Sequence, residues 1–227
     1  MKERLDRIKK RITDAAIRCG RDPESVRLVA VSKTMDADRV AQAIDAGAAI
    51  LGENYIQEAR DKFNALYDRP VRWHFIGHLQ SNKAKYAVRM FDLIHSVDSF
   101  KLAGALDKEA RKNDKVQDIL VQVNISREET KSGIEETEAV DLVTRVNGLK
   151  NVQIKGLMTM PPFFDQPEKA RPYFRRLARL RERIISSGIP GAGMEELSMG
   201  MTGDFEVAIE EGATLVRIGT AIFGARR

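Results

Sequence analysis

Lys33 is the residue of this sequence best placed for covalent chemistry, because it directly ends a short apolar run, Val29-Ala-Val-Ser-Lys33. At the end of a buried strand its ammonium group would be partly desolvated. Desolvation lowers the pKa of a lysine and frees the amine as a nucleophile. A lysine in a surface loop would follow the same residues, so this segment alone leaves both interpretations open.

Two segments near the carboxyl terminus indicate a phosphate site. They are Leu197-Ser-Met-Gly-Met-Thr-Gly-Asp204 and Val216-Arg-Ile-Gly-Thr-Ala-Ile-Phe-Gly224. Small residues let backbone N–H groups approach an anion closely, and Arg217 would add a fixed charge with planar donors. Tight packing of helix on sheet also selects glycine, but the paired occurrence favours phosphate binding. The small and hydroxyl residues concerned are Ser198, Gly200, Thr202, Gly219 and Thr220.

Polar residues stand at two further points of interest. Asn54, in Gly52-Glu-Asn-Tyr55, either donates a hydrogen bond into a binding site or caps the helix that follows. His74 lies within an apolar segment and is expected in the core, whereas His78, just after that segment, is the better site candidate. Three histidines and one cysteine without clustered spacing argue against a zinc site.

These residues stand where the strands of an alternating strand–helix chain should end. Several expected strands are near-continuous apolar runs, as strands of a buried parallel sheet are. The expected strands are residues 28–32, 50–52, 72–76, 93–96, 118–124, 153–157, 196–198 and 215–218. Two apolar stripes at helical spacing are Leu5, Ile8, Ile12, Ala15 and Cys19, and Ala170, Phe174, Leu177, Leu180 and Ile184.

Eight strands with intervening helices allow a closed barrel or an open doubly wound sheet. No Gly-x-Gly-x-x-Gly follows the first strand, which argues against the dinucleotide-binding form of the open sheet. A barrel usually takes ~250 residues, and this chain has 227. We therefore predict a protein of the α/β class, with a single (β/α)8 TIM barrel over residues 1–227 and an extra N-terminal helix. No linker or change of composition divides the chain, so one domain is expected.

The composition argues against several other classes of protein. The net charge is +5, but basic and acidic residues are interleaved, which indicates a solvated surface rather than a nucleic-acid interface. The one cysteine, Cys19, excludes an internal disulfide and suits a reducing compartment. No apolar run approaches the ~20 residues of a membrane span, and the N-terminus lacks the apolar stretch of a signal peptide. We expect a cytoplasmic protein that binds neither nucleic acid nor membrane.

The lysine and the two phosphate segments together indicate one ligand. Active sites of such barrels lie at the carboxyl ends of the strands, and in a closed barrel the first strand is the neighbour of the last. A molecule with both an aldehyde and a phosphate would span the two features, and pyridoxal 5′-phosphate (PLP) is such a molecule. A Schiff-base aldolase that binds a sugar phosphate would use the same lysine without a cofactor, and stays open.

These segments together resemble the pyridoxal phosphate homeostasis protein family, whose members look like the barrel domain of alanine racemase standing alone. The resemblance implies that Lys33 holds the cofactor as a covalent Schiff base, that Arg217 faces the pyridine nitrogen, and that Asn54 lies beside the cofactor. The phosphate contacts that it implies are those of Ser198, Gly219 and Thr220. The matching segments are residues 29–34, 52–55, 73–83, 94–98, 131–133, 156–158, 197–201 and 216–224.

The function that the resemblance implies is intracellular PLP (vitamin B6) and amino-acid homeostasis, with no established reaction and no catalytic residue. Alanine racemase has a further domain that supplies a catalytic tyrosine, whereas this sequence ends at Arg227, after the last expected barrel segment. A weakly active PLP-dependent amino-acid racemase, with Tyr55 or His78 as second base, is the alternative. The expected partners are PLP, amino acids and PLP-dependent apoenzymes, and a monomer is expected.

Overall fold

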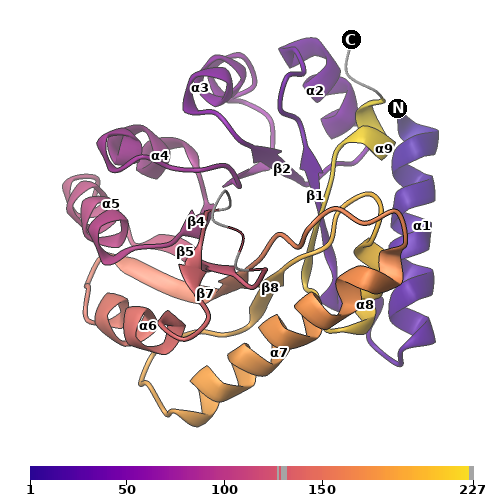
Figure 1. The fold of residues 1–227 in the computed structure, drawn as a ribbon. Coiled ribbons are helices and arrows are strands. Elements are labelled where there is room, and N and C mark those ends of the chain that lie inside the picture. Colours follow the sequence, from indigo (N-terminus) through magenta and orange to yellow (C-terminus); the bar gives the residue numbers. More distant parts are fainter. Residues whose placement is uncertain (127, 129–131, 225–227) are drawn as a thin grey trace.

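The computed structural model describes residues 1–126, 128 and 132–224 and shows parallel strands surrounded by helices (Figure 1). Lys131, in a segment that carries the family resemblance, lies outside the described residues, as does Arg227. The strands are β1 (Arg27–Val31), β2 (Ile50–Glu53), β3 (Arg72–Phe75), β4 (Leu93–Val97), β5 (Gln117–Asn124), β6 (Ile134–Glu135), β7 (Val152–Met158), β8 (Glu196–Ser198) and β9 (Leu215–Ile218). The helices are α1 (Lys2–Arg18), α2 (Ala37–Asp45), α3 (Ile56–Ala65), α4 (Ala84–Met90), α5 (Phe100–Lys112), α6 (Ala139–Asn147), α7 (Arg171–Ser186), α8 (Phe205–Glu210) and α9 (Thr220–Phe223).

Eight of these strands form a closed barrel. Their order around it is β4, β3, β2, β1, β9, β8, β7 and β5, and pairing of β4 with β5 closes the ring. In the register of the first strand, Ala30 lies opposite Leu51 of β2 and Ile218 of β9. The predicted (β/α)8 barrel is confirmed, and each barrel strand begins and ends within one residue of its expected bounds. The short strand β6, which pairs with β5 outside the ring, was not expected.

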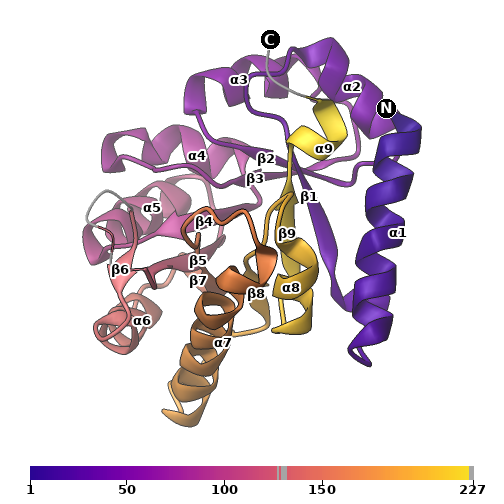
Figure 2. The ribbon, with the colours of Figure 1, turned by 45° about the vertical axis from the view of Figure 1, so that its right-hand side comes forward.

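The extra N-terminal helix is α1, which lies along the outside of the barrel near α8 and α9 (Figure 2). Its expected apolar stripe is confirmed for four residues, since Leu5, Ile8, Ile12 and Ala15 are all buried. Cys19 was wrongly included, because it follows the last helical residue and is exposed. Gly20 then takes a left-handed conformation (φ 72°), which ends the helical periodicity before it reaches the thiol.

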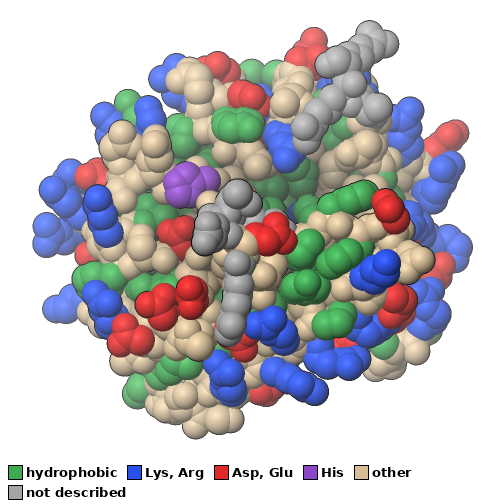
Figure 3. All heavy atoms as spheres, in the orientation of Figure 1, with side chains coloured by type: hydrophobic (Ala, Val, Ile, Leu, Met, Phe, Trp, Pro, Cys, Tyr) green, Lys and Arg blue, Asp and Glu red, His purple; other side chains and the backbone are tan. Residues whose placement is uncertain are grey.

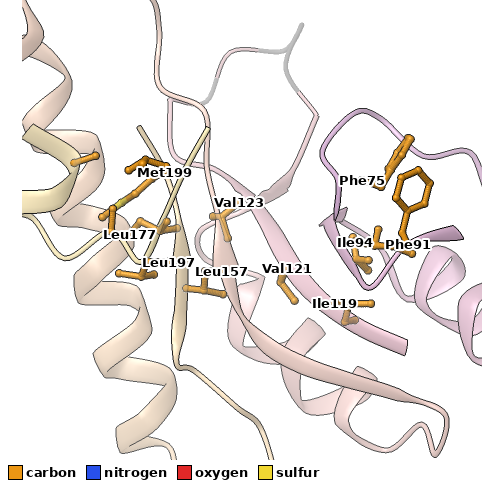
Figure 4. Packing of buried hydrophobic residues seen from close by; sticks show 14 of the residues in the cluster. Phe75, Phe91, Ile94, Ile119, Val121, Val123, Leu157, Leu177, Leu197 and Met199 are labelled. Atoms are coloured by element: carbon orange, nitrogen blue, oxygen red, sulfur yellow. The ribbon is translucent and has the colours of Figure 1, made fainter. Parts of the chain in front are cut away.

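Apolar side chains pack on both sides of the barrel strands, inside the barrel and between the strands and the helices. The inner cluster consists of Val29, Ile50, Leu93, Leu120, Met158 and Leu215. A larger cluster lies between strands and helices, where Figure 4 shows Leu177 of α7 with Leu197 and Met199. The second expected stripe, from Ala170 to Ile184, is buried in this layer. Each fully buried Leu or Phe side chain stabilises the fold by about 1.5–3 kcal/mol, so these layers hold the strand ends in place.

Candidate functional site

Lys33 lies at the carboxyl-terminal mouth of the barrel, two residues beyond the end of β1. Ser32 is fully buried, Lys33 is partly exposed and Thr34 is exposed, so the chain leaves the core at this lysine. Thr34 has a left-handed backbone (φ 65°), and its N–H donates to Glu58 Oε2 of α3 at 2.9 Å. A non-glycine residue in that region is strained, so the surrounding structure holds the turn that presents Lys33.

Three polar side chains lie buried beneath this turn and form what we call the lysine-side cluster: Ser32, Glu53 and Lys62. The Lys62 ammonium donates to Glu53 Oε1 at 2.6 Å and to the Ser32 carbonyl at 2.7 Å. The Ser32 hydroxyl donates to the same carboxylate oxygen at 2.5 Å. Burial raises the pKa of Glu53, and the charge and hydrogen bonds of Lys62 and Ser32 oppose that rise. The cluster ties β1, β2 and α3 together next to Lys33.

Lys33 shares a small hollow between the ends of β1 and β9 with two residues of the predicted phosphate site. The hollow, here called the β1/β9 hollow, has a volume of about 40 Å³ and is lined by Val31, Lys33, Thr34, Gly219, Thr220 and Gly224, among others. A Cβ atom at Gly219 would lie 3.2 Å from the Val31 carbonyl oxygen. Glycine therefore lets the segment after β9 lie close against β1, and the structure brings Lys33, Gly219 and Thr220 together.

The segment after β8 lies next to the segment after β9. The Arg217 N–H of β9 donates to the Gly200 carbonyl at 3.0 Å. Gly200 has φ 90°, and a Cβ atom there would lie 2.6 Å from Ala208 Cβ, so a larger residue would not fit. Asp204 Oδ1 accepts the Met201 N–H at 2.6 Å and fixes the turn that follows. The two predicted phosphate segments are therefore neighbours at the mouth.

Inside the barrel, four buried side chains form a continuous series of hydrogen bonds, here called the arginine-side chain: Arg217, Ser198, His95 and His74. Arg217 Nη1 donates to Ser198 Oγ at 2.5 Å, and Nη2 donates to the Thr159 carbonyl at 2.9 Å. His95 Nδ1 lies 2.8 Å from Ser198 Oγ, and His95 Nε2 lies 3.0 Å from His74 Nδ1. Ser198 thus turns its hydroxyl into the barrel, onto Arg217 and His95.

Burial sets the charge of each member of this chain. It lowers the pKa of His74 to about 3 and that of His95 well below the ordinary value, with nearby positive charges adding to both effects. It also lowers the pKa of Arg217, to about 10, and the charge of Asp204 opposes that decrease. At neutral pH the arginine-side chain therefore contains one guanidinium cation and two neutral imidazoles.

The neutral imidazoles give the chain a direction. Arg217 can only donate hydrogen bonds, so Ser198 Oγ accepts from it. Every group then has a partner if the Ser198 hydroxyl donates to His95 Nδ1. His95 Nε2 then carries the hydrogen and donates to His74 Nδ1. His74 lines a cavity of about 370 Å³ at the opposite end of the barrel. The chain therefore connects Arg217 to the far end of the barrel.

Sequence analysis singled out Arg217, Ser198 and His74 but missed the hydrogen bonds that connect them through His95. His74 was expected in the core and is only 3% exposed, but His95 appeared there only within a matching segment. Thr159 was not considered at all. The available signal was the alternation of β4, in which His95 follows Ile94 and precedes the buried Ser96. It indicates a buried histidine but not its partners, which come from other strands.

Asn54 and His78 lie at the mouth but outside the β1/β9 hollow. Asn54 follows β2, and its Oδ1 atom is buried without a hydrogen-bond partner among the described residues. Gly77 packs so closely on it that a Cβ atom there would lie 2.2 Å from the Asn54 carbonyl oxygen. His78 is exposed, with Nδ1 3.3 Å from Ser132 Oγ. Both residues, and the exposed Tyr55, line a separate groove between α3 and α4.

The fold and site define a barrel of the alanine racemase type, since the model of the alanine racemase N-terminal domain matches residues 4–227. The pyridoxal phosphate homeostasis protein of Aquifex aeolicus is 45% identical over 99% of this chain and 98% of its own. The chain belongs to the pyridoxal phosphate homeostasis protein family. A solved protein of unknown function from Bifidobacterium adolescentis is 37% identical, with a TM-score of 0.92 over 97% of this chain and 93% of its own. PipY of Synechococcus elongatus, solved with PLP bound, is 36% identical, with a TM-score of 0.84 over 96% of this chain and all of its own.

The residues present at the mouth fit such a cofactor. The β1/β9 hollow has room for an anionic group, and glycine at position 219 keeps it open toward Val31. Lys33 lines the same hollow. The buried amide oxygen of Asn54 has no hydrogen-bond partner among the described residues, and leaving such an acceptor unpaired costs about 1–3 kcal/mol. A ligand at the mouth would give it a partner.

None of the helices in the described part of the chain is both long and apolar enough to cross a membrane.

Proposed function

We propose that this chain binds PLP at the mouth of its barrel, with Lys33 as the Schiff-base residue, and that it serves PLP and amino-acid homeostasis. The observation that carries the proposal is the β1/β9 hollow, where Lys33, Gly219 and Thr220 line one space. Binding of PLP by the Synechococcus elongatus relative supports it. An amine and a phosphate-sized recess side by side suit a ligand with an aldehyde and a phosphate.

The remaining residues have roles that follow from their chemistry. In this proposal Ser198, Gly219 and Thr220 contact the phosphate, and Asn54 lies beside the cofactor. Arg217 would face the pyridine nitrogen, and because a guanidinium group donates hydrogen bonds and does not give up its proton, that nitrogen would stay unprotonated. The bound cofactor then supplies exchange of imines at Lys33 rather than strong stabilisation of carbanions.

We also propose that the protein acts as a monomer in the cytoplasm, as one barrel domain that exchanges PLP with amino acids and PLP-dependent apoenzymes. The free thiol of Cys19, exposed at the end of α1, suits a reducing compartment. The mouth supports exchange, because Lys33 is partly exposed there rather than enclosed in the core.

Borohydride reduction of the protein loaded with PLP tests the assignment. Reduction should fix one PLP per chain, and mass spectrometry of the digested protein should find it on the peptide that contains Lys33. Lys33→Ala should lose the adduct and the visible absorption of the imine, whereas Lys108→Ala, at an exposed position of α5, should keep both. A Lys33→Ala protein that still reduces to a stable adduct at the same stoichiometry would overturn the proposal.

A further inference from the structure

A groove of about 550 Å³ lies between the amino-terminal ends of α3 and α4, beside the site described above. We call it the α3/α4 groove, and the residues of its lining that matter here are Asn54, Tyr55, Arg60, His78, Lys83 and Tyr86. Its volume lies in the range of small-molecule sites, roughly 300–1,000 Å³. Much of its lining comes from residues 52–55 and 73–83, two of the segments that carry the family resemblance. Binding of PLP at Lys33 gives a role to Asn54 but to none of the other lining residues.

The charge of the α3/α4 groove is of one sign. Among the residues that the structure describes, its lining includes the cations Arg60 and Lys83 and no carboxylate. The cavity at the other end of the barrel contrasts with it, because Arg27 and Arg72 are there accompanied by Asp92, Asp118 and glutamates. Basic side chains lie over α4 on this face of the molecule, near a histidine, with acidic side chains further away over α3 (Figure 3). A lining with cations alone is suited to an anion.

The cations of the groove are only weakly compensated by their neighbours. Arg60 Nε lies 3.7 Å from Asp61 Oδ1, too far for a hydrogen bond. Lys83 Nζ lies 6.0 Å from the centroid of the Tyr86 ring, and Lys85 lies over the same ring at 4.7 Å. The pKa of Tyr86 is lowered by its hydrogen bond to Lys85 and by the charges of Lys85, Lys83 and Arg60. The largest part of this effect comes from Lys85, which lies outside the lining, and Lys83 and Arg60 add to it.

The rest of the lining is apolar or aromatic. Phe75, Leu79 and Ile56 contribute to it, together with Tyr55 and Tyr86. A bare inorganic anion would leave these surfaces uncovered. A small organic anion with an apolar part would cover them while its charged group pairs with Lys83 or Arg60, which matches the mixture of apolar walls and few polar anchors found in ligand sites.

The order of strands at the mouth relates the groove to Lys33. Going round the barrel, β9 and the residues proposed for phosphate come first, then β1 with Lys33, β2 with Asn54, and β3, whose end borders the groove. The phosphate side of the mouth is therefore on one side of Lys33 and the groove is on the other. An amine that approaches Lys33 from the side away from the phosphate arrives over Asn54.

We propose that the α3/α4 groove binds a free amino acid through its carboxylate and its apolar side chain, close to the mouth at which Lys33 lies. This inference rests on the proposed binding of PLP at Lys33. Lys83 pairs with the carboxylate, and the aromatic walls cover the side chain. The Asn54 oxygen, which has no partner among the described residues, accepts a hydrogen bond from the ammonium group.

A pair of probes that differ only in the carboxylate tests the site. L-phenylalanine and 2-phenylethylamine should be titrated calorimetrically into the protein without PLP, so that the readout does not depend on the cofactor. The wild-type protein should bind L-phenylalanine about tenfold more tightly, the usual effect of one charge-assisted hydrogen bond. Lys83→Gln should remove that difference. Lys85→Gln, an equal change of charge at a position outside the lining, should keep it.

Three outcomes would overturn the proposal: equal binding of both probes by the wild-type protein, equal losses in Lys83→Gln and Lys85→Gln, or displacement of L-phenylalanine by inorganic phosphate at lower concentration. The first means that no carboxylate is recognised, the second that only a general positive field acts, and the third that the site takes phosphate. Borohydride trapping of PLP in both variants separates the two proposals. If Lys33 is labelled in all proteins, only the groove is at issue, and if it is labelled in none, the function proposed for Lys33 fails.

Discussion

The lysine-side cluster and the arginine-side chain are equally buried but are stabilised in different ways. The first contains a cation and a carboxylate in direct contact, with Lys62 Nζ 2.6 Å from Glu53 Oε1. The second contains one cation, Arg217, whose contacts are a hydroxyl group and a backbone carbonyl, followed by two neutral imidazoles. Both lie beneath the mouth, one next to Lys33 and the other behind the predicted phosphate segments.

This difference determines how much stability is lost when one residue of each cluster is removed. Removing one partner of a buried ion pair leaves the other charge without compensation, at a cost of about 3–5 kcal/mol. Removing one of the neutral members of the arginine-side chain leaves unpaired donors or acceptors, at about 1–3 kcal/mol. One substitution in the lysine-side cluster, which positions Lys33, should therefore cost more stability than one substitution among the neutral members of the arginine-side chain, which hold Arg217.

Lys62→Met should have the largest effect on stability. It removes the ammonium from a site where Glu53 is fully buried and would then be an isolated buried charge. We expect the free energy of unfolding at pH 7 to fall by about 3–5 kcal/mol, measured by urea denaturation. The double variant Glu53→Gln/Lys62→Met should recover most of the loss. If the single and the double variants were equally stable, the carboxylate would not carry the effect.

Acid should destabilise the arginine-side chain through His74. Its folded pKa of about 3 lies below the ordinary value of 6.5, so between these values the unfolded state binds more protons. The stability is complete above pH 6.5 and is lost as the pH falls toward 3, by about 1.4 kcal/mol per pH unit for one histidine. Urea denaturation at pH 7, 6 and 5 would measure this slope, and His95, whose pKa burial also lowers, would steepen it.

His74→Gln is the variant that isolates this slope. Burial raises the pKa values of Glu53 and Asp204, and a raised carboxyl pKa has the opposite sign: its stability is present at low pH and is lost as the pH rises. Those groups stay in the variant, so the difference between the two proteins belongs to His74. Identical slopes in the wild-type and variant proteins between pH 7 and 5 would show that His74 is not the neutral, buried base described above.

The sequence predicts the two clusters unequally, for a physical reason. Lys33, Gly219 and Thr220 could be predicted because they follow apolar strands, and in a barrel the end of a strand is also the mouth. The role of Lys62 could not be predicted, since a lysine in a helix is usually solvated and the local sequence does not show that Glu53 is buried next to it. The cost of burying a charge is compensated only by a partner from another element.

The arginine-side chain was hidden for a related reason. Ser198 and Arg217 were assigned to a ligand from their segments alone, but the hydrogen bond between them depends on β8 lying beside β9. The contacts of His95 with Ser198 and His74 join β4 to β8 and β3. Alternation along a strand shows which side chains enter the barrel, while the contacts among them depend on closure of the ring.

Ser198→Ala should have an intermediate effect. It removes the oxygen that accepts from Arg217 Nη1 and the partner of His95 Nδ1. We expect a loss of about 1–3 kcal/mol, smaller than that of Lys62→Met, because Arg217 keeps its bond to the Thr159 carbonyl. Thermal unfolding at pH 7 would measure it. A loss as large as that of Lys62→Met would mean that the two clusters do not differ in the way described.

Glu58→Gln should have the smallest effect, and it sharpens the comparison at the edge of the lysine-side cluster. Glu58 lies 3.9 Å from Lys62 Nζ and accepts the Thr34 N–H, but its side chain is 37% exposed. Glutamine keeps an acceptor for that N–H, and a solvated carboxylate contributes little to an ion pair, so we expect a change in the free energy of unfolding of less than about 0.5 kcal/mol. Urea denaturation beside Lys62→Met would measure it. A loss above about 1.5 kcal/mol would show that the charged cluster extends to the surface, and that Lys33 depends on two carboxylates rather than on Glu53 alone.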